Sequence, residues 1–240
     1  MSGAGTGLSA ADRLCRACVE LLKIDGAAIS VMHSGATQGT FGSSGELSRR
    51  LDEFQFTFGE GPCLDAVSRG RPILVADLSD PEENRWPAFS GAVLGAGVRA
   101  VFALPVAITT VQVGALDLFR KEPGSLVESS LTGGLLAAEL AALPLLDLMT
   151  DDYVAWNDDL DGEDKWAQLA SLQRVEVYQA TGMIMGQLDV GPTEALVRLR
   201  AHAFAQGLTA SEVAWAIVER RLSLDDDEAW RKEGPGRADS

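Results

Sequence analysis

The sequence predicts an α+β protein, in which a mainly antiparallel sheet with flanking helices is followed by an all-helical unit of three helices. Residues 98–108 and 111–121 are the strongest strand patterns, and Thr109-Thr110 between them fits a tight hairpin turn. Residues 166–224 instead repeat apolar side chains at helical spacing, with breaks at "DVGP" and at Gly207. These two patterns place the sheet in the first part of the chain and the helical unit in the second.

The first part begins with a helix, for which Ser9 is the expected N-cap and Leu14, Cys18, Leu21 and Leu22 form an apolar stripe. Between this helix and the hairpin, strands are expected at 27–34, 39–44 and 71–78. Three helices are also expected there: one begins at Glu46, the second begins at Pro62, and the third ends near Gly95 or Gly97. A further helix is expected over 126–148. Because the last two strands are joined by a hairpin, we expect the helices to pack on one face of an antiparallel sheet.

The charge is distributed unevenly. The whole chain has a net charge of −15, which argues against a simple nucleic-acid binder. Residues 147–167 alone hold eight acidic residues and one lysine, whereas residues 168–224 hold five arginines and five acidic residues. We therefore predict a first domain over 1–148, an acidic linker over 149–165, a helical domain over 166–224 and an acidic tail over 225–240.

Composition excludes several classes of protein. With 46% hydrophobic residues the chain can bury a sizeable core. No segment is interpreted as a signal peptide or a membrane span, so a cytoplasmic location is expected. The three cysteines, Cys15, Cys18 and Cys63, are interpreted as core residues. We predict no metal site, no catalytic residues and no cofactor, because no phosphate loop, nucleophile elbow or metal cluster is visible.

The first helix of the helical unit is apolar on two sides. Val177, Ala180, Ile184 and Leu188 form one stripe, and Val175, Tyr178, Gly182 and Met185 form another. A unit of this size cannot bury both stripes, so the second is expected to meet another subunit or a ligand. Gly182 and Gly186 each cost this helix about 1 kcal/mol relative to alanine. Gly182 is interpreted as a point of close approach.

The other two helices are marked by cap signals. Gly191 and Pro192 can begin the second helix, and Gly207 can end it. Thr209 and Glu212 form a capping box for the third. Three such helices with arginines could bind DNA, RNA or protein, or form a dimerising bundle, and periodicity alone leaves these alternatives open. A DNA-reading helix-turn-helix is disfavoured because the arginines of the third helix stand only at its end.

Residues 177–218 resemble an ANTAR domain, the RNA-binding output module of bacterial transcription antitermination regulators. The resemblance is carried by Gln179-Ala180-x-Gly182-x-Ile184-Met185, Glu194-Ala195, Leu199-Arg200, Ala203 and Glu212-Val213-Ala214. It implies a homodimer that binds stem-loops in nascent mRNA. The residues expected to contact RNA are Arg174, Gln179, Thr181, Gly182, Arg198, Arg200 and His202. Where the family commonly has lysine this chain has Thr181, which removes a charge that could contact phosphate.

The first 150 residues resemble a GAF domain in their opening helix, in "GEGPC" at 59–63, in "DPEENRWPAF" at 80–89 and in "GVRAVFALPV". This resemblance implies a sensory domain with an unidentified small-molecule effector. The function that follows is a signal-responsive antitermination regulator. The alternative is a small-molecule sensor whose helical end serves mainly dimerisation or protein docking.

Overall fold

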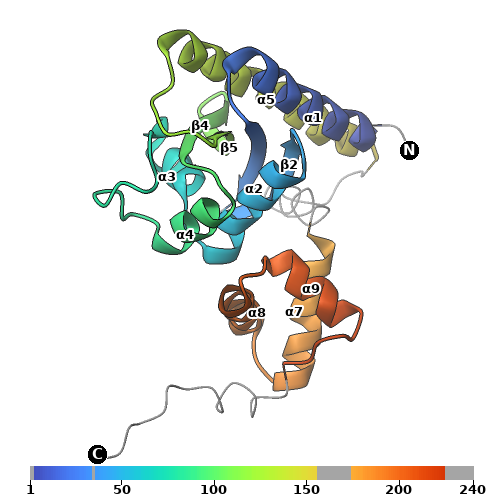
Figure 1. The fold of residues 1–240 in the computed structure, drawn as a ribbon. Coiled ribbons are helices and arrows are strands. Elements are labelled where there is room, and N and C mark those ends of the chain that lie inside the picture. The colour runs from blue at the N-terminus through green and yellow to red at the C-terminus, as the bar shows by residue number, and fades with distance from the viewer. Residues whose placement is uncertain (1–2, 34–35, 156–173, 225–240) are drawn as a thin grey trace, which may run out of the picture. The chain divides into compact units, whose positions relative to one another are not determined.

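The computed structural model describes residues 3–33, 36–155 and 174–224, and the chain divides into two compact units, one up to Arg174 and one from Val175 onward (Figure 1). The first unit contains a five-stranded sheet with the order β2-β1-β5-β4-β3, and its neighbouring strands are all antiparallel. Its strands are β1 (Gly26–His33), β2 (Ala36–Ser43), β3 (Ile73–Val75), β4 (Ala100–Ile108) and β5 (Val111–Arg120). The predicted hairpin is confirmed between β4 and β5, where Thr109 adopts a left-handed φ of 56°.

Helices cover both faces of this sheet, which corrects the prediction of a single covered face. One face packs against α1 (Gly3–Leu22) and α5 (Glu128–Ala155), and the other packs against α2 (Glu46–Phe58), α3 (Pro62–Arg69) and α4 (Pro87–Gly95). The reason is visible in β4, where Phe102 and Leu104 enter the first core and Val101 and Ala103 enter the second. A continuous apolar strand is typical of a sheet that is buried on both sides.

Two helix boundaries differ from those predicted. α1 begins at Gly3, so Ser9 lies inside the helix and is not its N-cap. α5 extends to Ala155, so the first seven residues of the predicted acidic linker are helical. The rest of that linker, the predicted helix start at Trp166 and the tail over 225–240 lie outside the described residues.

α5 has an unusual distribution of side chains. Apart from Leu145, small residues make up most of its buried face, whereas leucines stand on its exposed face. The buried face carries Gly134, Ala137, Ala138, Ala141 and Ala142, and a Cβ at Gly134 would lie 2.7 Å from a methyl group of Leu104. The exposed face carries leucines with these exposed fractions: Leu135 39%, Leu136 56%, Leu140 44%, Leu143 56% and Leu146 37%. A helix that is apolar all round is normally covered on both sides.

By length and composition, Glu128–Leu146 of α5 could also cross a membrane, with a mean hydropathy of 1.4, although no such span was expected from the sequence. In the structure 44% of this stretch is buried, and its small residues pack against α1 and the sheet. That is the environment of a core helix.

The second unit consists, within its described part, of α7 (Val175–Leu188), α8 (Pro192–Gln206) and α9 (Ala210–Val218). The predicted cap signals are confirmed. Gly191 is the N-cap of α8 with Pro192 in its first turn, and Gly207 ends α8 with a φ of 65°. At α9 the Glu212 N–H donates to Thr209 Oγ1 at 3.2 Å, and the Thr209 N–H donates to Glu212 Oε2 at 2.7 Å. These local bonds satisfy helix-end donors that would otherwise be unpaired.

Candidate functional site

The two stripes of α7 have different environments. Val177, Ala180 and Ile184 are 3%, 0% and 0% exposed and form the side that packs against α8 and α9. On the other side Val175 and Tyr178 are 45% and 51% exposed. The prediction that one stripe packs within its own domain is therefore confirmed, with Leu188 half-buried at its end. The second stripe is exposed except at Met185, which is half-buried.

Gly182 and Gly186 lie on the solvent side of α7. Both are exposed, and a Cβ built on either glycine would meet no atom of the described residues within 4 Å. Close packing inside this unit therefore does not account for either glycine. The space above Gly182 is open to a second chain or to RNA.

The polar residues of α7 that were predicted to contact RNA differ in how exposed they are and in their hydrogen bonds. Gln179 is exposed, next to Gly182 on the helix surface. Thr181 is half-buried, and its hydroxyl donates to the Val177 carbonyl at 2.6 Å. The only hydrogen of that hydroxyl is thus used inside the helix, so Thr181 can meet RNA as an acceptor.

The polar residues predicted on α8 lie on two flanks of the helix. Arg198 and His202 are one turn apart on one flank, and Arg200 lies half-buried toward the other. Arg198 donates to Glu194 Oε1 at 2.7 Å, in a pair whose side chains are 41% and 54% exposed. An exposed pair of this kind contributes little to stability, so Arg198 can exchange its carboxylate for a phosphate at small cost. Partial burial lowers the pKa of His202, which favours its neutral form.

Arg174 is placed in the first unit and not on the three-helix unit. It is 2% exposed, and its guanidinium carbon lies 4.0 Å from the centroid of the Phe56 ring. Such a cation–π contact is favourable when both groups are desolvated. A contact between Arg174 and RNA would require the guanidinium to leave that ring.

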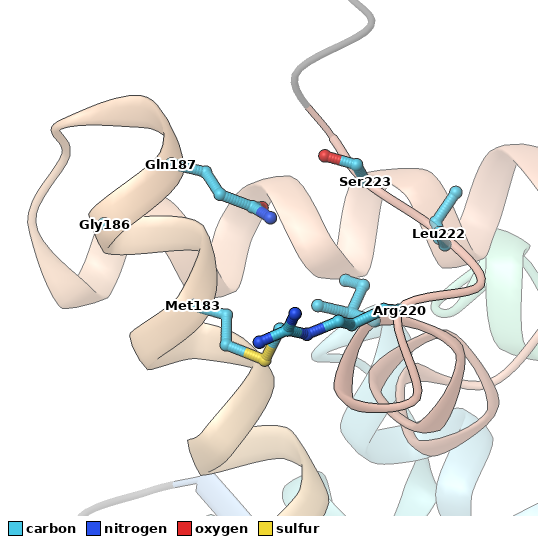
Figure 2. Close-up of a pocket in the computed structure, with 7 residues that line it drawn as sticks. Met183, Gly186, Gln187, Arg220, Leu222 and Ser223 are labelled. Carbon is cyan, nitrogen blue, oxygen red and sulfur yellow. The ribbon is translucent and has the colours of Figure 1, made fainter.

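A hollow of about 400 Å³ lies between the second half of α7 and the end of α9, and sequence reasoning did not anticipate it (Figure 2). Met183, Ile217 and Leu222 supply apolar surface, and Gln187, Arg220 and Ser223 supply polar groups. Gly186 borders the hollow. The helical pattern of the sequence places Gly186 and Gln187 on the solvent side of α7, which was a partial signal for this hollow. The residues after α9 that complete its lining could not be predicted, because their position depends on how the chain turns there.

The core of the first unit contains a buried polar cluster on the face covered by α2 and α3. Asp52 of α2 accepts hydrogen bonds from the hydroxyls of Ser30 and Thr40. Gln55, one turn later, donates to Asp117 Oδ2 at 2.6 Å and accepts from the Cys63 N–H at 2.9 Å. The cluster therefore joins β1, β2, β5, α2 and the start of α3.

Asp117 is the most perturbed group of this cluster. It is fully buried, and its Oδ1 has no hydrogen-bond partner among the described residues. Burial, and then the nearby charge of Asp52, raise the pKa of Asp117 well above its ordinary value. Its neutral form is the one that the core favours.

The three cysteines are buried, as expected of core residues. Burial raises the pKa of the Cys18 thiol to about 11, so this thiol is unreactive at neutral pH. Cys63 lies against Met32, with 3.6 Å between the two sulfur atoms. Over residues 3–33, 36–155 and 174–224, no three His, Cys, Asp or Glu side chains gather as a metal site would require.

Comparison with known proteins supports this division of the chain. The sequence matches the family model of the GAF domain over residues 9–143 and that of the ANTAR domain over residues 167–218. No curated protein sequence matches it.

Several solved structures are similar in fold. A domain assigned to a two-component sensor histidine kinase protein from Sinorhizobium meliloti 1021 is 17% identical with a TM-score of 0.50, over 62% of this chain and 96% of that one. The GAF domain of a phosphoenolpyruvate-protein phosphotransferase from Coxiella burnetii is 18% identical with a TM-score of 0.49, over 61% and 86%. A type II free methionine-R-sulfoxide reductase from Thermoplasma acidophilum is 16% identical with a TM-score of 0.47, over 61% and 96%. At these identities the likeness concerns the fold alone.

The GAF match accounts for more than half of the sequence, and the ANTAR match overlaps all three helices of the second unit. Both are regulatory domains, and their combination fits a regulator with a sensory domain and an RNA-binding output. The predicted order of the two domains is confirmed. This chain belongs to the GAF domain family and carries an ANTAR domain after its GAF domain.

Proposed function

We propose that this chain is a cytoplasmic, signal-responsive regulator and not an enzyme, and that it promotes transcription antitermination by binding stem-loops in nascent mRNA. The observation that carries the proposal is the open solvent face of α7 around Gly182, in a unit that matches the ANTAR family. A backbone or a base can approach this helix closely, because no side chain stands on it there. Gln179 and Tyr178 beside it offer an amide and an aromatic ring, which suit the exposed bases of an RNA loop.

Electrostatics set the expected strength of binding. Residues 168–224 hold equal numbers of arginines and acidic residues, so few phosphates can be neutralised. We expect weak binding with a shallow dependence on salt. Binding of a tandem stem-loop RNA, measured by filter retention from low to physiological salt, tests this. If the full chain shows no binding even at low salt, RNA binding is not its function.

The proposed form is a homodimer assembled through the exposed leucines of α5, namely Leu135, Leu136, Leu140, Leu143 and Leu146. Their exposed fractions add up to more than two whole leucine side chains per copy. Covering that surface in two copies releases on the order of 10 kcal/mol before the cost of association. A second copy presents the same helix, so each leucine face can cover the other in a two-fold symmetric contact.

The mass of the full chain in solution, compared with that of a Leu136→Gln, Leu140→Gln, Leu143→Gln variant, tests this assembly. We expect a concentration-dependent dimer for the natural chain and a folded monomer for the variant. The result that would refute it is a monomer in both cases. Binding of the natural chain to vesicles of neutral lipid would assign the leucine face to a membrane instead.

We further propose that an unidentified small molecule acts through the GAF domain and alters RNA binding by the ANTAR domain. The continuity of α5 from the core of the first unit to Ala155 supports such coupling. Removal of residues 1–150 should change both RNA affinity and dimerisation, and unchanged values would contradict the coupling.

A second candidate function has its own supporting observation. Val197 and Phe204 on α8 are 58% and 60% exposed, and Trp215 on α9 is 50% exposed. Exposed apolar side chains of this size favour protein docking. In that case the helical unit would bind a protein partner, and Phe204→Ser would abolish that binding without changing RNA retention.

A further inference from the structure

The hollow between α7 and α9 has the chemical character of a binding site for a flat, polar-edged ring. Its apolar surface comes from Met183, Ile217 and Leu222, and the side chains of Gln187 and Arg220 also line it (Figure 2). Gly186 contributes no side chain, and in the part of the chain that the structure describes no atom lies within 4 Å of where its Cβ would be. The volume of about 400 Å³ lies in the range of small-ligand sites.

Arg220 occupies a backbone position that normally selects glycine. Its φ is 58°, and the N–H groups of Arg220 and Arg221 donate to the carbonyls of Ile217 at 2.9 Å and Ala216 at 2.8 Å. This is the left-handed helix ending for which glycine is preferred, and Gly207 has that role at the end of α8 with a φ of 65°. A left-handed arginine is strained, and such strain is typical of positions whose side chain has a function.

The side chain of Arg220 reaches across the hollow. In Figure 2 its side chain points from the end of α9 toward α7, which carries Met183 and Gln187. Within the part of the chain that the structure describes, Arg220 forms no ion pair, whereas Arg221 donates to Glu219 at 2.6 Å and Arg198 to Glu194 at 2.7 Å. The cation of Arg220 is thus held over an apolar floor, at a position where its backbone is strained.

These groups together match an RNA base and its phosphate. A base that has left its stack needs an apolar surface or a guanidinium plane against its ring. Its edge needs donors and acceptors, which the primary amide of Gln187 and the hydroxyl of Ser223 carry. The adjoining phosphate needs a cation, and a guanidinium provides it. An apolar peptide side chain would leave this amide and this cation without a matching group.

We propose that this hollow takes one unstacked nucleobase of an RNA loop, with Gln187 at the edge of the base and Arg220 at its ring or its phosphate. The inference rests on the proposed RNA-binding function and adds residues that the resemblance to the ANTAR family did not supply. It also gives Gly186 a role, because a side chain there would narrow the hollow.

The test compares two single substitutions in the full-length protein that remove the same charge. Arg220→Gly empties one side of the hollow and relieves the left-handed strain, so this variant should fold at least as well as the natural chain. Arg221→Ala removes an equal charge one residue away, outside the hollow. With a stem-loop RNA at low salt, we expect Arg220→Gly and Gln187→Ala to weaken binding about tenfold, as loss of one stacked base does. We expect Arg221→Ala to weaken it less than twofold.

A second readout locates the base. With 2-aminopurine placed at each loop position in turn, one position should change its fluorescence on binding to the natural protein and not to Arg220→Gly. Equal losses for Arg220→Gly and Arg221→Ala, or no responsive loop position, would overturn the proposal. If the natural chain does not bind RNA at all, the proposed function fails and this site fails with it. If it binds and Arg220→Gly binds equally well, only this site fails.

The competing occupant is the chain's own acidic segment, residues 225–240, which begins soon after Ser223. Two observations together would reveal it. Arg220→Gly would bind RNA as tightly as the natural chain, and removal of residues 225–240 would lower the stability of the natural chain but not that of Arg220→Gly. That result would also overturn the proposal.

Discussion

Replacement of Gly182 by alanine should make the second unit more stable and a poorer RNA binder. Gly182 lies inside α7, where glycine is less favourable than alanine by about 1 kcal/mol. Among residues 3–33, 36–155 and 174–224, a Cβ at this position would meet nothing within 4 Å, so the variant should gain this helix stability without strain in the free protein. For a unit of this size, 1 kcal/mol corresponds to a rise in Tm of roughly 4–8 °C.

The opposite effect is expected in the complex. If an RNA backbone or a base lies on α7 at Gly182, a methyl group there would push it away by about an ångström or more, and we expect affinity to fall about tenfold, which is close to 1.4 kcal/mol. Thermal unfolding followed by circular dichroism measures the gain, and filter retention with stem-loop RNA measures the loss.

Gly91→Ala is the matched control for this experiment. Gly91 lies within α4 of the first unit and is exposed, and none of the described residues comes within 4 Å of its Cβ position. It should raise stability and leave RNA affinity unchanged. A more stable Gly182→Ala that binds RNA as tightly as the natural chain would refute the reasoning. The helix stability that glycine loses would then not be offset by tighter RNA binding.

Three further predictions concern the caps, the buried carboxyl and the missing charge. Thr209→Ala should lower the stability of the second unit by about 1 kcal/mol through loss of the capping box, with a lower Tm as the readout and an unchanged Tm as the contrary result. Asp117→Asn should gain stability relative to the natural chain as pH rises from about 5 to 8, measured as the difference in Tm. The folded pKa of Asp117 lies above its unfolded value, so the natural fold binds more protons and loses stability as pH rises toward that folded pKa, and a pH-independent difference would contradict this. Thr181→Lys should tighten RNA binding and steepen its salt slope by about 0.7–0.9, the contribution of one phosphate contact, and an unchanged slope would show that residue 181 does not face RNA.

Local features of the fold were predictable from sequence because their causes are local. The β4–β5 hairpin, the capping box of Thr209 and the helix end at Gly207 each depend on residues within one turn of each other. The second core on the other side of the sheet was missed. The hairpin indicates an antiparallel sheet, which commonly has one covered face, whereas the continuous apolar pattern of β4 is the signal of a strand that is buried on both faces.

The candidate sites show the same division. The stripes of α7 followed from helical period, and the structure confirms the buried one. The pairing of Gln55 with Asp117 joins residues 62 positions apart, and no pattern in the sequence connects them. The left-handed φ of Arg220 was equally hidden, since an arginine after a helix is ordinarily interpreted as a favourable charge near the carboxyl end of the helix.

The leucine face of α5 offers a physical answer to why a nearly neutral helical unit can serve as an RNA binder. If α5 joins two copies, two ANTAR units act on one RNA, and the second contact becomes intramolecular once the first has formed. Two weak contacts can then exceed either one by 10²–10⁴-fold when the hairpins are suitably spaced. The variant with Leu136, Leu140 and Leu143 changed to glutamine should therefore bind a single hairpin as the natural chain does, yet lose at least tenfold affinity for a tandem pair. Equal losses on both RNAs would mean that these leucines affect the binding surface itself, and no loss on the tandem RNA would mean that each ANTAR unit binds alone.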